Sequence, residues 1–245
     1  MVKPLRIGCA GWSIASGDRH RFPPAGSHLE RYAAVFTAVE VNSSFYRPHK
    51  PATWQRWAAS VPDDFRFAAK LPRTITHHRR LIGALPLLDT FLGEVGALGD
   101  KLGVLLMQLP PSLAFDARSV ATFLRAFRAR HGGDVCVEPR HASWFDEPAN
   151  ALLRRHRIAR VAADPALNAA AALPGGDLSL RYTRWHGSPR MYYSDYDDAR
   201  LEALMQRLAA ERSAGANVWC IFDNTAAGHA VPNALTLQRL AALRR

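Results

Sequence analysis

Several short apolar runs in this sequence end in a residue that can transfer a proton or act as a nucleophile. Lys70, Glu138 and His186 each stand at or near the end of such a run. Lysine, glutamate and histidine are residue types that enzymes use for acid-base and covalent chemistry. We therefore take these three as candidate catalytic residues.

Other run ends carry side chains suited to orienting a substrate. Arginine forks bind carboxylate or phosphate, aromatic rings stack on sugars or bases, and amides both donate and accept hydrogen bonds. The candidate substrate-binding residues are Trp12, Asn42, Tyr46, Gln108, Arg140, His141, Asp164, Arg184 and Asn224.

Lys70 is distinctive because the chain has 32 lysines and arginines, of which only four are lysines, and only Lys70 ends an apolar run. A desolvated amine can lose its proton, form a Schiff base with a carbonyl, or hold a point charge against phosphate. The alternative is an ion pair with Glu40 or Glu138. Glu138 and Arg140 lie two residues apart and therefore share one face of their expected strand. A catalytic role for this pair and a structural role, in an ion network with Glu40, Lys70 and Arg184, are equally open.

The spacing of the runs predicts the element that must bring these residues together. Runs of four to eight apolar residues bounded by Gly, Pro or polar residues indicate buried strands, and the segments between them are long enough for crossover helices. Eight such units in a chain of 245 residues predict a TIM-type (β/α)₈ barrel, a single α/β domain over 1–245. The expected strands are 7–11, 39–46, 65–69, 104–109, 135–141, 158–163, 180–186 and 218–222.

Helical periodicity and long loops separate these strands. Apolar residues three and four apart predict helices over 28–38, 53–60, 85–98, 120–130, 148–156, 198–214 and 234–244. Loops longer than a simple connection follow four strands, and in a barrel they would line the mouth. These loops are 13–27, 47–52, 72–83 and 187–197.

Motifs for metals and cofactors are absent from the sequence. His141, His186, Glu138 and Asp164 fall on neighbouring expected strands, but none of them is part of an HxH, HExxH or DxD motif that would support a metal site. There is no GxxxxGK[ST] or GxGxxG pattern, so we expect no cofactor. The three cysteines lie inside expected strands without CxxC spacing and are expected to be buried free thiols.

The net charge of +11 suggests anionic ligands without identifying one. The arginines are spread over most expected helices, which disfavours a nucleic-acid partner but leaves it open. No apolar stretch has the length of a membrane helix and no secretory signal precedes the first strand, so we expect a cytoplasmic protein with no membrane partner. The oligomeric state is not indicated.

The ordered run-end motifs resemble those of the DUF72, or YecE-like, family. The matching motifs are IGCAGW at 7–12, VEVNSSFY at 39–46, FRFAAK at 65–70, QLPP at 108–111, EPRH at 138–141, SWF at 143–145, RWHG at 184–187, FDN at 222–224 and NA at 233–234. The resemblance implies a TIM-type fold and does not imply a reaction. Two residues depart from the family pattern: Asp223 stands where an Asn-Asn pair is common, and Pro139 separates Glu138 from Arg140.

Together these features lead to one hypothesis and two alternatives. The hypothesis is a cofactor-independent hydrolase, lyase or isomerase that acts by acid-base chemistry on a small anionic, phosphorylated or sugar-derived molecule at the barrel mouth. The alternatives are a nucleic-acid-binding protein or nuclease, and a ligand sensor without catalysis.

Overall fold

The eight apolar runs form the strands of one sheet in the computed structural model, which describes residues 3–244. Residues 1, 2 and 245, the ends of the expected domain, lie outside the described residues. The strands follow one another in the order β7-β9-β10-β1-β2-β3-β4-β5-β6-β8. They are β1 (Leu5–Ala10), β2 (Ala38–Val41), β3 (Arg66–Lys70), β4 (Leu102–Gln108), β5 (Asp134–Glu138), β6 (Ala159–Arg160), β7 (Ala162–Asp164), β8 (Gly175–Gly176), β9 (Leu180–Trp185) and β10 (Asn217–Phe222).

The sixth expected strand joins the two ends of this order. It is divided at Val161 into β6, which pairs in parallel with β5, and β7, which pairs in parallel with β9. The backbone N–H of Val161 still donates to the carbonyl of Val137 at 2.9 Å. The parallel strands therefore form an almost closed barrel, and β8 is a short antiparallel addition to β6. The predicted barrel fold is confirmed.

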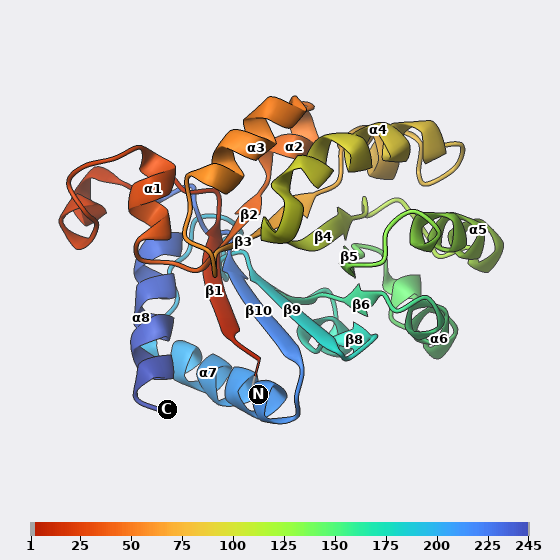
Figure 1. Cartoon of the computed structure of the whole chain (residues 1–245). Helices are drawn as coiled ribbons and strands as arrows, with labels where there is room; N and C mark the ends of the chain where they lie inside the picture. Colours follow the sequence, from red (N-terminus) through yellow and green to blue (C-terminus); the bar gives the residue numbers. More distant parts are fainter. Residues whose placement is uncertain (1–2, 245) are drawn as a thin grey trace.

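Helices surround the sheet on its outer side (Figure 1). The segment between β7 and β9 holds a short 3-10 helix, η5 (Ala169–Ala172), and β8 where the other crossovers hold an α-helix. The α-helices are α1 (His28–Ala33), α2 (Ser43–Tyr46), α3 (Pro51–Ala59), α4 (Leu85–Val95), α5 (Ala117–Arg128), α6 (Glu147–Arg155), α7 (Asp198–Ser213) and α8 (Ala230–Ala242). The remaining turns are the 3-10 helices η1 (Ser16–Arg21), η3 (Gly96–Lys101) and η4 (Ala142–Trp144), and the π-helical turn η2 (Thr74–His78).

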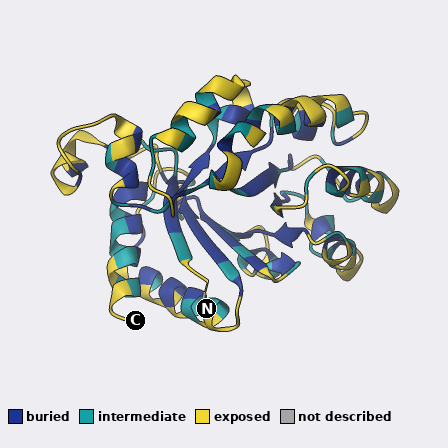
Figure 2. Cartoon of the chain, in the orientation of Figure 1, coloured by how far each residue is buried: buried dark blue, intermediate teal, exposed yellow. Residues whose placement is uncertain are grey.

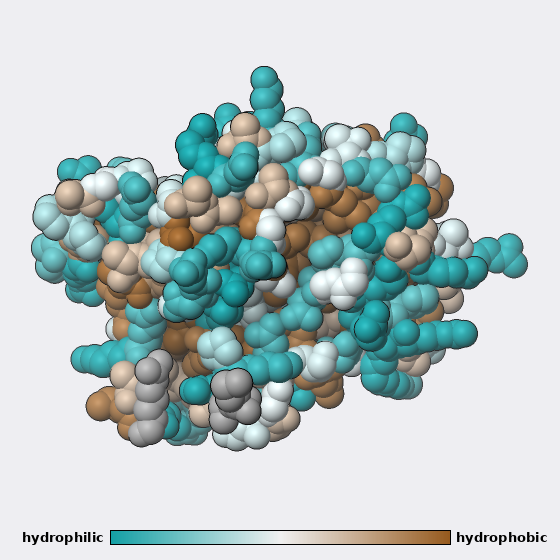
Figure 3. Space-filling model, in the orientation of Figure 1, coloured by the Kyte–Doolittle hydropathy of each residue, from teal (hydrophilic) through white to brown (hydrophobic). Residues whose placement is uncertain are grey.

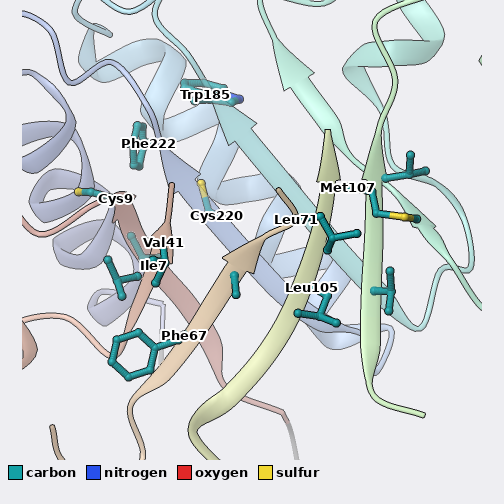
Figure 4. Close-up of a cluster of buried hydrophobic side chains, with 14 of the residues drawn as sticks. Ile7, Cys9, Val41, Phe67, Leu71, Leu105, Met107, Trp185, Cys220 and Phe222 are labelled. Atoms are coloured by element: carbon teal, nitrogen blue, oxygen red, sulfur yellow. The ribbon is translucent and has the colours of Figure 1, made fainter. Parts of the chain in front are cut away.

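Side chains alternate between two buried layers because successive residues of a strand point to opposite faces. One layer lies between strands and helices, and Figure 4 shows part of it, including Ile7, Phe67 and Phe222. The other layer fills the barrel and includes Val104, Tyr182 and Trp219 together with small residues such as alanine. The strands are accordingly buried while the outer helix faces are exposed (Figure 2).

Two expected strands are shorter than predicted. The run 39–46 ends as a strand at Val41, because the Ser44 hydroxyl donates to the carbonyls of Val41 at 3.0 Å and Lys70 at 2.7 Å, which draws the following residues into the turn of α2. The run 135–141 ends as a strand at Glu138, since Pro139 has no N–H to continue the ladder.

Smaller boundary differences also occur. The run 180–186 stops one residue early, at Trp185. The helices expected at 28–38 and 85–98 end at Ala33 and Val95, and a 3-10 turn, η3, continues the second. Helix ends fray and often finish in 3-10 geometry, which apolar spacing does not reveal.

No helix within residues 3–244 is both long and apolar enough to cross a membrane. Figure 3 shows hydrophilic side chains over much of the visible face, with hydrophobic atoms between them. This pattern fits helices whose apolar sides pack on the sheet.

Candidate active site at the carboxyl ends of the strands

The carboxyl ends of the barrel strands bring together side chains that are far apart in sequence. Lys70 ends β3, Gln108 ends β4 and Glu138 ends β5. His186 and Asp223 directly follow β9 and β10. In a barrel of parallel strands these positions share one rim, which is where TIM-barrel enzymes place their active sites.

A fully buried arginine is at the centre of this cluster. Arg184 donates from Nη2 to Glu40 Oε1 at 2.6 Å and from Nε to Glu40 Oε2 at 3.0 Å. The Tyr182 hydroxyl donates to the same Glu40 Oε2 at 2.9 Å. Both carboxylate oxygens of Glu40 therefore have partners inside the barrel, which is typical of a structural residue.

Arg184 also joins two carboxylates nearer to the rim. Its Nη1 donates to Glu138 Oε2 at 2.6 Å, and its Nη2 donates to Asp223 Oδ2 at 2.9 Å. Gln108 donates to Glu138 Oε2 at 2.9 Å, and Arg140 donates to Glu138 Oε1 at 2.7 Å. The Glu138 carboxylate thus accepts hydrogen bonds from Arg184, Gln108 and Arg140.

His186 bridges the same two carboxylates and is fully buried. Its Nδ1 lies 2.9 Å from Asp223 Oδ2, and its Nε2 lies 2.8 Å from Glu138 Oε1 and 2.9 Å from Arg140 Nη2. A ring protonated on both nitrogens donates to both carboxylates, whereas a ring protonated only on Nδ1 accepts from Arg140 and no longer donates to Glu138. His186 therefore connects Asp223 to Glu138 and Arg140.

The carboxylates of this cluster are held ionised. Burial alone would raise the pKa of Glu138, but Arg184, His186 and Arg140 together lower it well below its ordinary value. Burial opposes ionisation of Asp223 as well, and Arg184 and His186 outweigh it, so its pKa is also lowered. Neither carboxyl is suited to releasing a proton near neutral pH.

A cavity of about 600 Å³ opens above this cluster. It is surrounded by residues from the strand ends, from α2 and from the loops after β3, β9 and β10. Its lining residues are Asn42, Phe45, Tyr46, Lys70, Arg73, His77, His78, Gln108, Tyr192, Tyr193, Asp223, Thr225 and Ala226.

Lys70 extends its amine into this cavity in an apolar setting. Its Nζ lies 4.2 Å from the centroid of the Phe45 ring, and only 6% of the residue is exposed. Among residues 3–244, no carboxylate oxygen lies within 4.0 Å of this amine. Burial and the charge of Arg184 lower the pKa of Lys70 to about 8, although Glu40, Glu138 and Asp223 act in the opposite direction.

The candidate residues divide into three groups by position. Lys70, Asn42, Tyr46 and Gln108 line the cavity, as the prediction of a shared rim requires. Glu138, Arg184 and His186 lie beneath it in the buried cluster, and Arg140 contacts two of them. The third group lies elsewhere and comprises Trp12, His141, Asp164 and Asn224.

Each residue of the third group has a local partner. Trp12 packs edge to face on Trp57 at 5.0 Å between ring centroids. His141 caps η4 and lies 2.9 Å from the Ser143 hydroxyl. Local contacts of this kind point to structural roles.

The other two residues of the third group are held by residues outside the cavity. Arg200 donates to the Asp164 carboxylate at 2.8 Å. Asn224 donates to Asn233 Oδ1 at 2.8 Å. Neither side chain lines the cavity.

Asp223 is a site residue that the candidate set omits. It lines the cavity and accepts from Arg184 and His186. Two signals point to it in the sequence: it follows the eighth apolar run, and it replaces the amide expected from the family pattern. Phe45 and Arg73 were missed as well, since neither stands at a strand end.

The cysteines do not take part in this site. Cys9, Cys136 and Cys220 are buried free thiols, as predicted. Burial raises the pKa of Cys9 to about 12, and it raises the pKa values of the other two further above their ordinary range. In residues 3–244 no group of three or more His, Cys, Asp or Glu side chains is arranged to hold a metal ion.

The barrel and its rim cluster define an α/β protein with a candidate active site at the carboxyl ends of its strands. The chain belongs to the DUF72 family, described as a protein of unknown function, whose family model matches residues 6–245. The resemblance seen in the strand-end motifs is thereby confirmed.

Curated relatives of the chain occur in Escherichia coli and Bacillus subtilis. The chain is 32% identical to the UPF0759 protein YecE of Escherichia coli K12 over 142 residues, which are 56% of this chain and 52% of the relative. It is 24% identical to the UPF0759 protein YunF of Bacillus subtilis over an alignment of 265 positions, gaps included, with 94% of this chain and 92% of the relative covered. The match thus spans about half the length of the Escherichia coli protein.

Solved structures of the family share the fold. A DUF72 family protein from Enterococcus faecalis superposes with a TM-score of 0.81 at 19% identity, covering 98% of this chain and 96% of that one. A DUF72 family protein from Thermotoga maritima superposes with a TM-score of 0.80 at 24% identity, covering 97% and 99%. At these identities the likeness establishes the fold alone.

Proposed function

We propose that this protein is an enzyme that carries out acid-base chemistry on a small anionic molecule in the rim cavity, with Lys70 as the proton-transfer group. The observation that carries the proposal is the position of the Lys70 amine, which lies in a cavity, is almost fully buried and has no carboxylate within 4.0 Å among the described residues. A lysine kept only for stability would be expected to have an ion-pair partner.

The titration of Lys70 suits this role. A pKa of about 8 leaves a substantial uncharged fraction near neutral pH. The uncharged amine accepts a proton from a bound substrate, and the resulting ammonium returns it at a later step. Proton transfer of this kind is sufficient for a hydrolase, lyase or isomerase that needs no cofactor.

Basic side chains near the cavity mouth suit an anionic substrate. Arg73, His77 and His78 line the cavity on the segment that follows β3, and no acidic residue occurs in 70–80. Exposed Tyr46 and Tyr193 add rings that can pack on a sugar. A phosphorylated or sugar-derived anion fits this lining.

In this proposal Glu138 and His186 are positioning residues. Both contact Asp223 or Gln108, which line the cavity, and neither lines the cavity itself. Their network with Arg184 and Arg140 holds the cavity floor and fixes the charge beneath Lys70.

The test is a ligand screen followed by turnover measurements. Small phosphorylated and carboxylated compounds are added to the protein, binding is detected as a shift in melting temperature, and hits are followed by NMR for chemical change. Lys70→Met is expected to lower turnover by about 10²- to 10⁴-fold. Lys50→Met, which changes an exposed lysine outside the cavity, should leave turnover unchanged.

Two outcomes would replace the proposal. Tight binding of a hit without turnover in the native protein would indicate a ligand sensor. Nucleic-acid binding that falls steeply as salt rises, with no small anion bound, would indicate the nucleic-acid alternative.

A further inference from the structure

The surroundings of Lys70 suit a nucleophile as well as a base. The amine faces an aromatic ring on one side, that of Phe45, and a cavity of about 600 Å³ provides room for a substrate atom beside it. The ring of Phe45 in turn contacts that of His77, with 4.9 Å between centroids. Lys70 and the basic residue His77 therefore both pack against the ring of Phe45.

Amine nucleophilicity depends on the uncharged fraction. With a pKa of about 8 instead of 10.5, that fraction at pH 7 is greater by roughly 300-fold than for an ordinary lysine. Desolvation and a neighbouring cation are the two means by which enzymes activate lysines toward carbonyl groups. Both act here, because Lys70 is buried and Arg184 lies beneath it.

Next to this amine are the basic side chains Arg73, His77 and His78, which line the same cavity. The pKa of His77 is lowered by burial and then by Lys70, His78 and Arg73. An anion bound among these side chains offsets the positive charges that contribute to this lowering. The cavity thus offers a nucleophile and an anion-binding segment side by side.

We propose that Lys70 forms an imine with the aldehyde or ketone group of a small anionic substrate, whose charged group binds to Arg73, His77 and His78. This inference rests on the proposed function and narrows its substrate class to anionic carbonyl compounds. The amine lone pair attacks the carbonyl carbon, and the electrons of the C=O π bond move to oxygen. The two amine hydrogens then leave with that oxygen as water, so an amine and a carbonyl give an imine and water.

Reductive trapping tests the imine. The full-length protein is incubated at pH 7 with glyoxylate, an anionic aldehyde, and sodium cyanoborohydride, which reduces an imine to a stable secondary amine. Peptide mapping by mass spectrometry then locates the adduct, which is unambiguous because the chain has only four lysines. Lys70→Arg and Lys50→Arg serve as matched variants, and circular dichroism verifies that both are folded.

The expected result is an adduct at Lys70 that exceeds the adduct at Lys50 by about tenfold or more, since only an uncharged amine attacks a carbonyl. Lys70→Arg should lose this adduct and Lys50→Arg should keep it. Acetaldehyde, an uncharged probe, should give a lower ratio of Lys70 to Lys50 labelling than glyoxylate does. Equal labelling of the two lysines by glyoxylate overturns the imine, and equal ratios for the two probes overturn the anion-binding segment.

Calorimetry with glyoxylate separates the two proposals. If glyoxylate binds and no Lys70 adduct forms, the imine inference fails while proton transfer by Lys70 stands. If no adduct forms and no compound in the anion screen binds, both fail.

Discussion

Arg184 and Glu40 form a two-point ion pair inside the barrel, with Nη2 2.6 Å from Oε1 and Nε 3.0 Å from Oε2, and both side chains are fully buried. The pair links β9 to β2 across the barrel interior. Because Arg184 also reaches Glu138 and Asp223, it joins the structural part of the cluster to the cavity floor.

Removing this arginine should destabilise the fold strongly. Arg184→Met leaves Glu40, Glu138 and Asp223 close together without their shared cation, so we expect a loss of about 3–5 kcal/mol in the free energy of unfolding. Urea denaturation followed by circular dichroism measures this. Arg154→Met, which removes an exposed pair with Glu147, is the control and should cost about 1 kcal/mol or less. Similar losses in the two variants would mean that the buried cluster does not hold the barrel together.

The stability of the protein should depend on the titration of Lys70. Its pKa is about 8 when folded, against ~10.4 in an unfolded chain, so between these pH values the unfolded chain binds more protons and stability rises with pH. Lys70→Met lacks this contribution. The stability of the native protein relative to Lys70→Met should therefore increase by on the order of 1–3 kcal/mol from pH 7 to pH 10.

Urea denaturation of both proteins at several pH values measures this difference. Groups distant from Lys70 titrate alike in both proteins, and the lowered pKa values of its neighbours His77 and Asp223 lie below this pH range, so their contributions cancel in the comparison. A difference that stays constant with pH would show that Lys70 titrates alike in the folded and unfolded states.

The three cysteines should be unreactive in the folded protein. They are buried, and burial raises their pKa values, so little thiolate forms at pH 8. Iodoacetamide is expected to modify all three in urea and none in buffer over the same time, as read by intact mass. Rapid alkylation of any one in buffer would reopen a role for a cysteine nucleophile.

The strand order and the shared rim were accessible from the sequence. The eight apolar runs predict the strands of the barrel. The alternation of side chains along each strand predicts which residues face the barrel interior, including Glu40, Glu138 and Arg184. Lys70 and Gln108, which the run ends single out, both line the cavity. The resemblance to DUF72 gave the same fold independently.

The apolar runs do not predict how deeply a strand-end side chain is buried or how the loops are folded. A strand-end position does not reveal whether a side chain lines a cavity or lies beneath it, which separates Lys70 from Glu138 and His186. Arg73 lies at the N-cap of η2 and Phe45 lies in α2, and the turn of α2 depends on a tertiary hydrogen bond from the Ser44 hydroxyl to the carbonyl of Lys70. The spacing of apolar residues does not predict such contacts.

Asp223 should tune the amine of Lys70. Its carboxylate is one of three that raise the pKa of Lys70 against the larger effect of burial. Asp223→Asn, which removes this negative charge, is therefore expected to lower that pKa further. The pH dependence of Lys70 arylation by dinitrofluorobenzene measures the change, with Asp100→Asn as an exposed control. An unchanged or raised pKa in Asp223→Asn would contradict the electrostatic description of the rim.

The most direct test of the account is the titration midpoint of Lys70 in the native protein. Trace labelling with dinitrofluorobenzene across pH 6–11, followed by peptide mapping, gives a separate curve for each of the four lysines. The expected result is a Lys70 midpoint near pH 8, together with protection of Lys70 when an anionic ligand occupies the cavity. A Lys70 midpoint at ~10.4, the value of an ordinary lysine side chain, would contradict it.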